Sequence, residues 1–297
     1  MIPSGCSTVG MRAIFNWDTF RGYLQEEISD FEYNFLKRVF SQAALSFGGF
    51  GAAVCAISAI SGVGPFKSVM ENSGFKGACL IAALISGAAL MLYYLPRYHS
   101  NPMDVTPKFV RRAYITLMVT YGTIFIALFK GLELIGVTSG DSGFANVGLG
   151  GALFGATLLV YAIPAAIGVL MQRHSTALKL SRFVKNCYLA YLGLFLVGLV
   201  VTLATFTLGG SGSSSLSGLW EAKKMLMMLL YGAIVFVSPI LSIYRMKMVT
   251  RYVDEKDPVA IKKWELFFVF EILVQLMQMA IYIVRMAFSC VTCTARR

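Results

Sequence analysis

The last long apolar stretch of the chain, residues 263–289, carries five polar side chains among hydrophobic neighbours. They recur every three or four residues, as Glu271, Gln275, Gln278, Tyr282 and Arg285. At 3.6 residues per turn, this spacing places all five on one face of a helix, here called the polar stripe. A carboxylate, two amides and a guanidinium are costly in hydrocarbon. We therefore expect the stripe to face a helix bundle, a wet cavity or a partner protein.

The opposite face of the same stretch is apolar, and we expect it to meet lipid. It comprises Phe267, Ile272, Leu273, Leu276, Ile283 and Ala287. An acidic residue inside a membrane is a functional candidate by default, because burying its charge is costly. Glu271 is therefore the residue around which we expect the function to be organised.

The composition indicates a multi-pass membrane protein. Of 297 residues, 57% are hydrophobic and 14% are charged, against about 25% charged in an average soluble domain. The charges gather between long apolar runs, which a soluble fold would interleave with polar residues. The net charge of +11 would suit a protein that binds nucleic acid. The Lys and Arg residues instead follow the loop pattern of membrane proteins, so nucleic acid is not expected as a partner.

Seven apolar segments are long enough to cross a hydrocarbon core of about 30 Å. They lie near 39–61, 77–96, 111–136, 147–171, 186–208, 224–246 and 263–289. The predicted fold is thus all-α, a seven-helix transmembrane bundle over residues 36–297. Residues 1–35 mix aromatic and acidic residues and lack the apolar core of a secretory signal. They are predicted to form an N-terminal interfacial segment.

The basic residues predict an orientation and a set of lipid contacts. With seven spans, 18 of the Lys and Arg residues fall on one side and 8 on the other. This asymmetry places the N-terminus inside and the C-terminus outside. Two groups in the inside loops are expected to contact anionic headgroups, with bound cardiolipin plausible. They are Arg97, Lys108, Arg111, Arg112, Arg173, Lys179, Arg182 and Lys185.

Motifs for catalysis or metal binding are absent from the sequence. The two histidines, His99 and His174, lie in predicted loops without metal-ligand spacing. No nucleophile elbow or phosphate loop is present. The C-x-x-C of Cys290 and Cys293 has no second pair and is weak evidence for a metal or redox site. We therefore expect no enzyme, no catalytic residue, no metal and no cofactor other than phospholipid.

Two stretches carry a family resemblance. The run FLKRVFSQAALSFGGFGAA at 35–53 resembles the first-span entry of the transmembrane Bax inhibitor motif (TMBIM) family. FVFEILVQLM at 268–277, which follows a charged loop containing Asp257-Pro258, resembles that family's last-span pattern. The resemblance implies a seven-span protein that acts as a proton-sensitive calcium leak, with two aspartates facing each other from spans six and seven.

The aspartate positions of that family are occupied differently in this chain. The span-six position falls on Ser238 or Pro239, where Pro239 also predicts a helix kink. The span-seven position falls on Glu271 if three residues are inserted after Asp257-Pro258, and on Phe268 otherwise. At most one carboxylate of the pair is kept. Calcium takes six to eight oxygen ligands, and the spans hold no acidic cluster that would supply them.

Two functions follow from these observations. The first is a non-catalytic structural or assembly subunit of a larger membrane complex on a Bax-inhibitor-like scaffold. Its partners would be other integral membrane subunits, in the mitochondrial inner membrane, for respiratory or ATP-synthase assembly. The second is a proton-sensitive calcium or cation leak or exchanger, in which Glu271 titrates and Ser238, Gln275 and Gln278 line the path. A protein of the endoplasmic reticulum, Golgi or plasma membrane would show a similar pattern.

Overall fold

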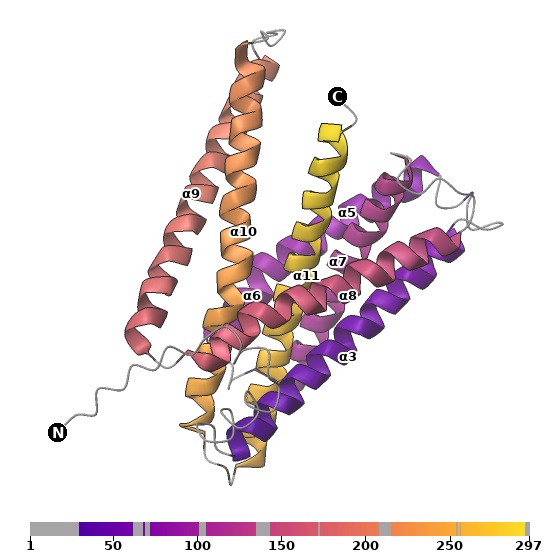
Figure 1. Cartoon of the computed structure of the whole chain (residues 1–297). Coiled ribbons are helices and arrows are strands. Elements are labelled where there is room, and N and C mark those ends of the chain that lie inside the picture. Colours follow the sequence, from indigo (N-terminus) through magenta and orange to yellow (C-terminus); the bar gives the residue numbers. More distant parts are fainter. Residues whose placement is uncertain are drawn as a thin grey trace.

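A computed structural model of the chain describes residues 30–61, 68, 72–100, 105–134, 143–171, 173–207, 215–253, 255 and 257–294. Every regular element within these ranges is a helix (Figure 1). Seven helices are long and apolar enough to cross a membrane. The predicted class, an all-α multi-pass protein with seven spans, is confirmed.

The helices follow one another as α3 (Asp30–Ser61), α5 (Ser73–Ala89), the π-helical turn η1 (Leu90–Tyr94), α6 (Leu95–Ser100), α7 (Pro107–Leu134), α8 (Gly143–Leu170), α9 (His174–Thr207), α10 (Ser215–Thr250) and α11 (Pro258–Thr294). Helices α5, η1 and α6 are continuous and together form the second span. Helix α3 begins at Asp30, within the segment expected to lie at the interface. The rest of that segment, residues 1–29, lies outside the described residues.

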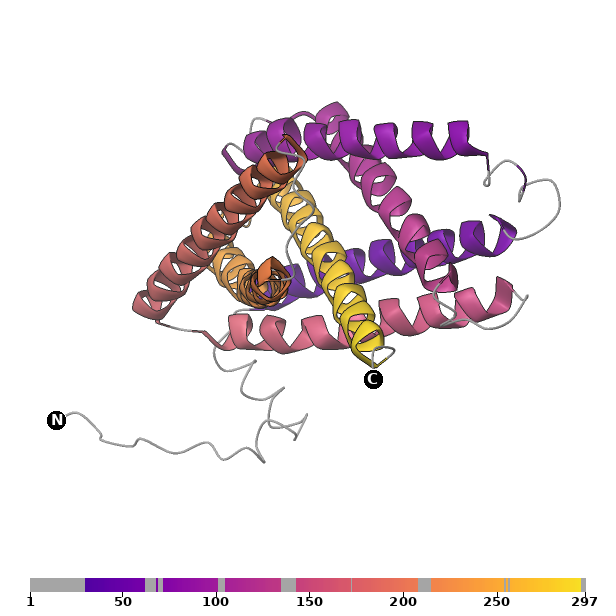
Figure 2. The same ribbon diagram turned by 90° about the horizontal axis from the view of Figure 1, so that it is seen from above.

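Helix α11 occupies the centre of the bundle. It packs against α3, α7, α8 and α10, and Figure 2 shows it crossing α3 and α8, with the α9–α10 hairpin on one side and α7 on the other. In its most apolar stretch, 72% of the residues are buried, whereas the corresponding stretches of the second and fifth spans are 6% buried. The second and fifth spans are therefore peripheral, and α11 is the helix on which the others assemble.

The expectation that the apolar face of α11 meets lipid is wrong for most of its length. Phe267, Ile272, Leu273 and Leu276 have at most 1% of their surface exposed. The physical reason is that a neighbouring helix and a lipid tail are equally apolar, so an apolar face does not reveal which of them it contacts. Further along, Ile283 is partly buried and Ala287 is exposed.

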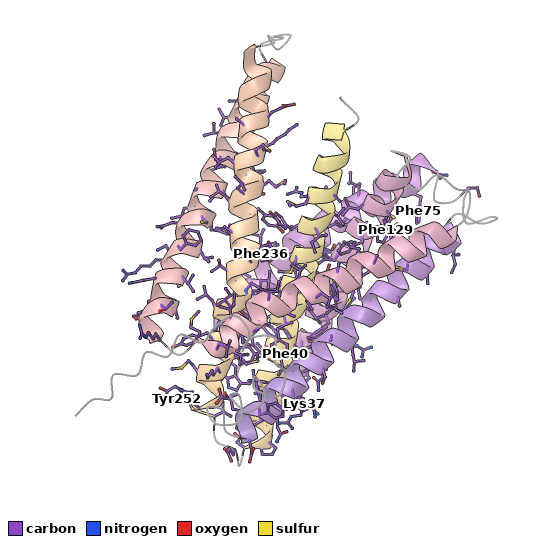
Figure 3. All side chains as sticks on the ribbon, viewed as in Figure 1. Lys37, Phe40, Phe75, Phe129, Phe236 and Tyr252 are labelled. Atoms are coloured by element: carbon purple, nitrogen blue, oxygen red, sulfur yellow. The ribbon has the colours of Figure 1, made fainter. Side chains whose placement is uncertain are left out.

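Side chains fill the space between the helices (Figure 3), and in the core aromatic rings from different helices meet. The Phe154 ring of α8 packs against Phe47 of α3 and Phe125 of α7, with centroid separations of 5.2 and 5.3 Å. Gly51 makes room for this ring, because a Cβ atom there would lie 2.8 Å from it. Gly51 thus allows a close approach of α3 and α8.

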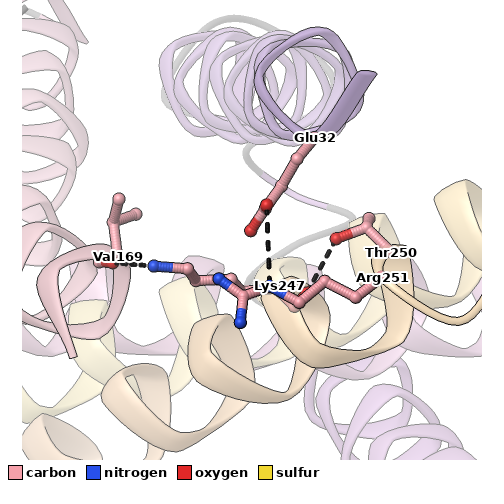
Figure 4. A network of polar contacts seen from close by, with 5 residues as sticks. All are labelled: Glu32, Val169, Lys247, Thr250 and Arg251. Atoms are coloured by element: carbon pink, nitrogen blue, oxygen red, sulfur yellow. Dashed lines mark hydrogen bonds and ion pairs between the residues drawn. The ribbon is translucent and has the colours of Figure 1, made fainter. Parts of the chain in front are cut away.

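Ion pairs and hydrogen bonds tie the helices together at the end of the bundle where α3 begins (Figure 4). The Lys247 Nζ of α10, whose residue is 3% exposed, donates to the Val169 carbonyl in the last turn of α8 at 3.2 Å. Arg251 Nε lies 3.9 Å from Glu32 Oε2 of α3. Arg38 and Glu265 join α3 to α11 over 3.0 Å. These contacts fix the ends of four helices relative to one another.

The short connection between α10 and α11 ends in a helix cap. The Asp257 carboxylate accepts hydrogen bonds at 3.0 Å from the backbone N–H groups of Val259 and Ala260. Pro258 occupies the first helical position, where its missing N–H costs nothing. Helix α11 thus starts at Pro258, directly after its capping residue Asp257. This cap sets the start of the helix that carries the polar stripe.

Candidate functional site

All five residues of the polar stripe contact other helices of the same chain. Glu271 hydrogen-bonds with Ser242 of α10. Gln275 and Gln278 hydrogen-bond with tyrosines of α8 and α7, and the last two residues pack on α10. The Tyr282 ring meets the Phe236 ring, whose position Figure 3 labels, at 6.1 Å. The exposed Arg285 has its Cζ 5.9 Å from the Tyr231 ring centroid. The stripe therefore faces the bundle, one of the three environments expected for it.

A polar pocket of about 360 Å³ lies where α10 meets α11. Its polar lining comes from six residues, and the apolar remainder includes Leu95 of α6. The six are Ser238, Ser242, Arg245, Glu271, Gln275 and Gln278. Four of them, Ser238, Glu271, Gln275 and Gln278, are the residues that the sequence assigned to an ion path. The structure brings them together in one pocket.

Glu271 is the acidic centre of this pocket. Beyond its hydrogen bond with Ser242, its Oε2 atom is buried without a hydrogen-bond partner among the described residues. A buried carboxylate oxygen that lacks a donor is costly, because it has lost its water and gained nothing in return. The geometry therefore favours a site where a proton, a cation or water completes the coordination of Glu271.

Arg245 supplies a positive charge to the same pocket. It lies on α10 one turn beyond Ser242 and within electrostatic range of Glu271. Its side chain is exposed, and its Cζ lies 5.3 Å from the centroid of the Phe267 ring on α11. This cation–π contact holds the guanidinium near the pocket. Since arginine stays protonated, the net charge of the Glu271 and Arg245 pair depends on the protonation of Glu271.

Two tyrosines hold the amides of the stripe. The Tyr161 hydroxyl of α8 donates to Gln275 Oε1 at 2.9 Å, and both residues are buried. Tyr121 of α7 hydrogen-bonds with Gln278. Tyr161 also lines a second cavity, an apolar one of about 440 Å³ between α3, α8 and α11. The stripe thus separates a polar pocket on the α10 side from an apolar cavity on the α3 side.

The family resemblance pointed to Ser238 or Pro239 as the span-six partner of Glu271. Ser238 lines the pocket and Pro239 is buried, but the hydrogen-bond partner is Ser242, one turn later. Ser242 and Arg245 were not predicted from the sequence as residues of the site. Their signal was the spacing of Ser238, Ser242 and Arg245, which by itself places three polar groups on one face of span six.

The eight basic residues expected at lipid headgroups all have exposed side chains. Three of them, Arg97, Lys108 and Arg112, line a separate pocket of about 320 Å³ at the junction of η1, α6 and α7. Arg111 is not among the residues that line it. In the second group, Arg173 directly precedes α9, and Lys179, Arg182 and Lys185 lie in its first third. The sequence predicts the same headgroup contact for both groups, but only the first group contributes residues to this pocket.

The chain matches no family model, and no curated protein or solved structure matches it.

Proposed function

We propose that this protein is a proton-sensitive cation leak or exchanger in which Glu271 is the titrating group. The observation that carries the proposal is the half-buried Glu271, which hydrogen-bonds with Ser242 and lies near Arg245 in a pocket between α10 and α11. Most buried carboxylate oxygens in proteins have a hydrogen-bond partner. Here Oε2 is buried without a partner among the described residues, which supports a role in binding or transfer.

The chemistry of the pocket favours protons and monovalent cations over calcium. Calcium prefers six to eight oxygens with several carboxylates among them. Among the described residues that line the pocket, Glu271 is the one acidic group, and Arg245 opposes it. The resemblance of 35–53 and 268–277 to the TMBIM family supports a leak in general terms. This chain keeps at most one of the two carboxylates of the TMBIM family, which supports transport of an ion other than calcium.

We further propose the mitochondrial inner membrane as the location, with the N-terminus inside and the C-terminus outside. The excess of basic residues on the side of the N-terminus supports the orientation. Basic clusters in the same loops suit a membrane rich in anionic lipid, which supports the location.

The test is ion flux through the purified full-length protein in liposomes, comparing wild type with Glu271→Gln. The amide keeps the shape and removes the charge. Flux of protons or potassium should fall at least about tenfold, which corresponds to a barrier increase of roughly 1.4 kcal/mol. Glu265→Gln is the matched control, because Glu265 lies on the same helix but pairs with Arg38 and does not line the pocket. Equal flux through wild type and Glu271→Gln would exclude this function.

A structural or assembly subunit is the second candidate function. Helix α9 favours it, since it packs mainly on α10 and leaves large apolar side chains such as Phe195, Leu196 and Val200 about half exposed or more. Such a surface suits either lipid or a partner subunit. Native electrophoresis of gently solubilised membranes separates the two functions. Migration of nearly all the protein with one large assembly, and no flux from the isolated chain, would favour the subunit.

A further inference from the structure

The pocket at the junction of η1, α6 and α7 is strongly basic. Arg97 comes from α6, and Lys108 and Arg112 lie four residues apart on α7, so that both fall on one face. Thr106, Tyr93, Tyr94 and Phe109 line the rest together with Val105, and none of these is acidic. Three basic side chains line one cavity of about 320 Å³, and their positive charge attracts an anion.

Aromatic rings give the pocket a fixed shape. Arg97 Cζ lies 6.0 Å from the Tyr93 ring centroid and 5.9 Å from that of Phe109. The Tyr94 and Phe109 rings meet at 5.1 Å, and Tyr98 stacks between Phe109 and the Phe267 ring of α11. The exposed Arg97 guanidinium therefore lies near two aromatic rings, one from η1 and one from α7. The π-helical turn η1 ends at Tyr94 and shifts the face that the following residues present.

The position of the pocket indicates where its ligand resides. It lies at the ends of the second and third spans, Gly77–Tyr98 and Pro107–Phe129, which is the level of the lipid headgroups. On the same two helices, the exposed side chains within two turns include Leu92 and Ile115, at 80% and 54%. A phosphate held by the three cations would thus have apolar surface beside it for acyl chains. A free phosphate would make no use of that surface.

We propose that Arg97, Lys108 and Arg112 bind the phosphate of one anionic phospholipid, and that the site favours headgroups with about two negative charges. Guanidinium groups bind phosphate oxygens through paired N–H donors, and the lysine adds a third charge. Arg111 contributes only to the general positive surface. The group at the start of α9 does the same, because none of its members is among the residues that line this pocket. The proposal is independent of ion conduction.

The experiment is native mass spectrometry of the full-length protein after reconstitution in nanodiscs of phosphatidylcholine with a minority of cardiolipin, followed by release into detergent at elevated salt. Salt screens the attraction between exposed charges, so lipid held only at the surface dissociates and lipid bound in a pocket remains. Wild type should keep one cardiolipin per chain. Arg112→Gln should retain it at least about tenfold less well, as expected from losing one charged hydrogen bond. Arg111→Gln, altered at the neighbouring residue, should stay within about twofold of wild type.

Further variants keep the test decisive if Arg112→Gln is poorly folded. Lys108→Gln should also lose lipid, and Arg112→Lys should recover part of it, with folding followed by thermal melting. Phosphatidylglycerol, with one charge, should be kept less well than cardiolipin. Equal retention in the Arg111 and Arg112 variants would overturn the proposal. Displacement of the lipid by inorganic phosphate at similar concentration would also overturn it, and would assign the site to free phosphate.

Discussion

The Tyr161 hydroxyl of α8 donates a hydrogen bond of 2.9 Å to Gln275 Oε1 on α11, at the point where α11 separates two cavities. Tyr161 lines the apolar cavity, and Gln275 lines the polar pocket that contains Glu271. Both side chains are buried. The bond therefore joins α8 to the central helix and also forms part of the wall between the two cavities.

Tyr161→Phe should destabilise the protein. The substitution keeps the ring and removes the donor, so a buried amide oxygen loses its partner, at a cost of about 1 to 3 kcal/mol. Tyr114→Phe on α7 is the matched control, because the Tyr114 hydroxyl is buried without a hydrogen-bond partner in the part of the chain that the structure describes. Thermal melting in one detergent should show a lower midpoint for Tyr161→Phe and an unchanged or higher one for Tyr114→Phe. Equal losses in both would refute this assignment of the bond.

Only part of the candidate site could be predicted from the sequence. Glu271, Gln275 and Gln278 could be found because polar residues are rare in a membrane span and share a helical period. Tyr161 and Tyr121 could not, because a tyrosine in an apolar span suits an interface, a core or a lipid boundary equally well. Which tyrosine meets which amide depends on how three helices are arranged, and the period of one helix does not contain that information.

Lys247→Met should destabilise the end of the bundle shown in Figure 4. Lys247 is 3% exposed and donates to the Val169 carbonyl at the end of α8, where a cation also interacts favourably with the helix dipole. Methionine keeps most of the volume but removes the charge near Glu32, so a loss of about 3 kcal/mol is expected. Lys262→Met, at an exposed position on α11, should change the melting midpoint little. Similar midpoints for the two variants would argue against the contact.

Gly168→Ala should weaken the packing of α8 against α10. A Cβ atom at Gly168 would lie 2.9 Å from the Ile240 carbonyl oxygen and 2.9 Å from the Ile243 Cβ, so the helices must separate. Such overpacking costs about 1 to 3 kcal/mol. At Gly155 on the same helix, a Cβ would meet nothing within 4 Å. There, alanine should stabilise the helix by up to about 1 kcal/mol, and melting of the two variants should shift in opposite directions.

Asp257→Ala should loosen the start of α11. It removes the acceptor for the N–H groups of Val259 and Ala260, for an expected loss of about 1 kcal/mol. Asp257→Asn keeps an acceptor at the same place and should recover most of the stability. Hydrogen exchange of the first turn of α11 should be faster in the alanine variant only. Equal exchange in alanine and asparagine variants would contradict the cap.

The seven spans were predictable because length and apolar composition alone determine which segments can cross a membrane. The centrality of α11 was not. Leu273 and Leu276 would be equally stable against lipid, and only the tertiary arrangement shows that both are buried in the bundle. In the same way, Arg111 and Arg112 are neighbours in the sequence, but of the two only Arg112 lines the pocket at the junction of η1, α6 and α7.

Cation flux should fall as the pH is lowered. When Glu271 is ionised, its charge offsets that of Arg245. When it is protonated, the guanidinium is left uncompensated beside the pocket. At an effective dielectric constant of about 20, a cation about 5 Å from that charge is disfavoured by roughly 3 kcal/mol. Potassium flux into liposomes should therefore decrease on acidification in wild type, and in Glu271→Gln it should be low and independent of pH. Arg245→Gln should retain flux in acid, because no positive charge remains to repel the cation. An increase of wild-type flux on acidification would show that Glu271 does not control the path in this way.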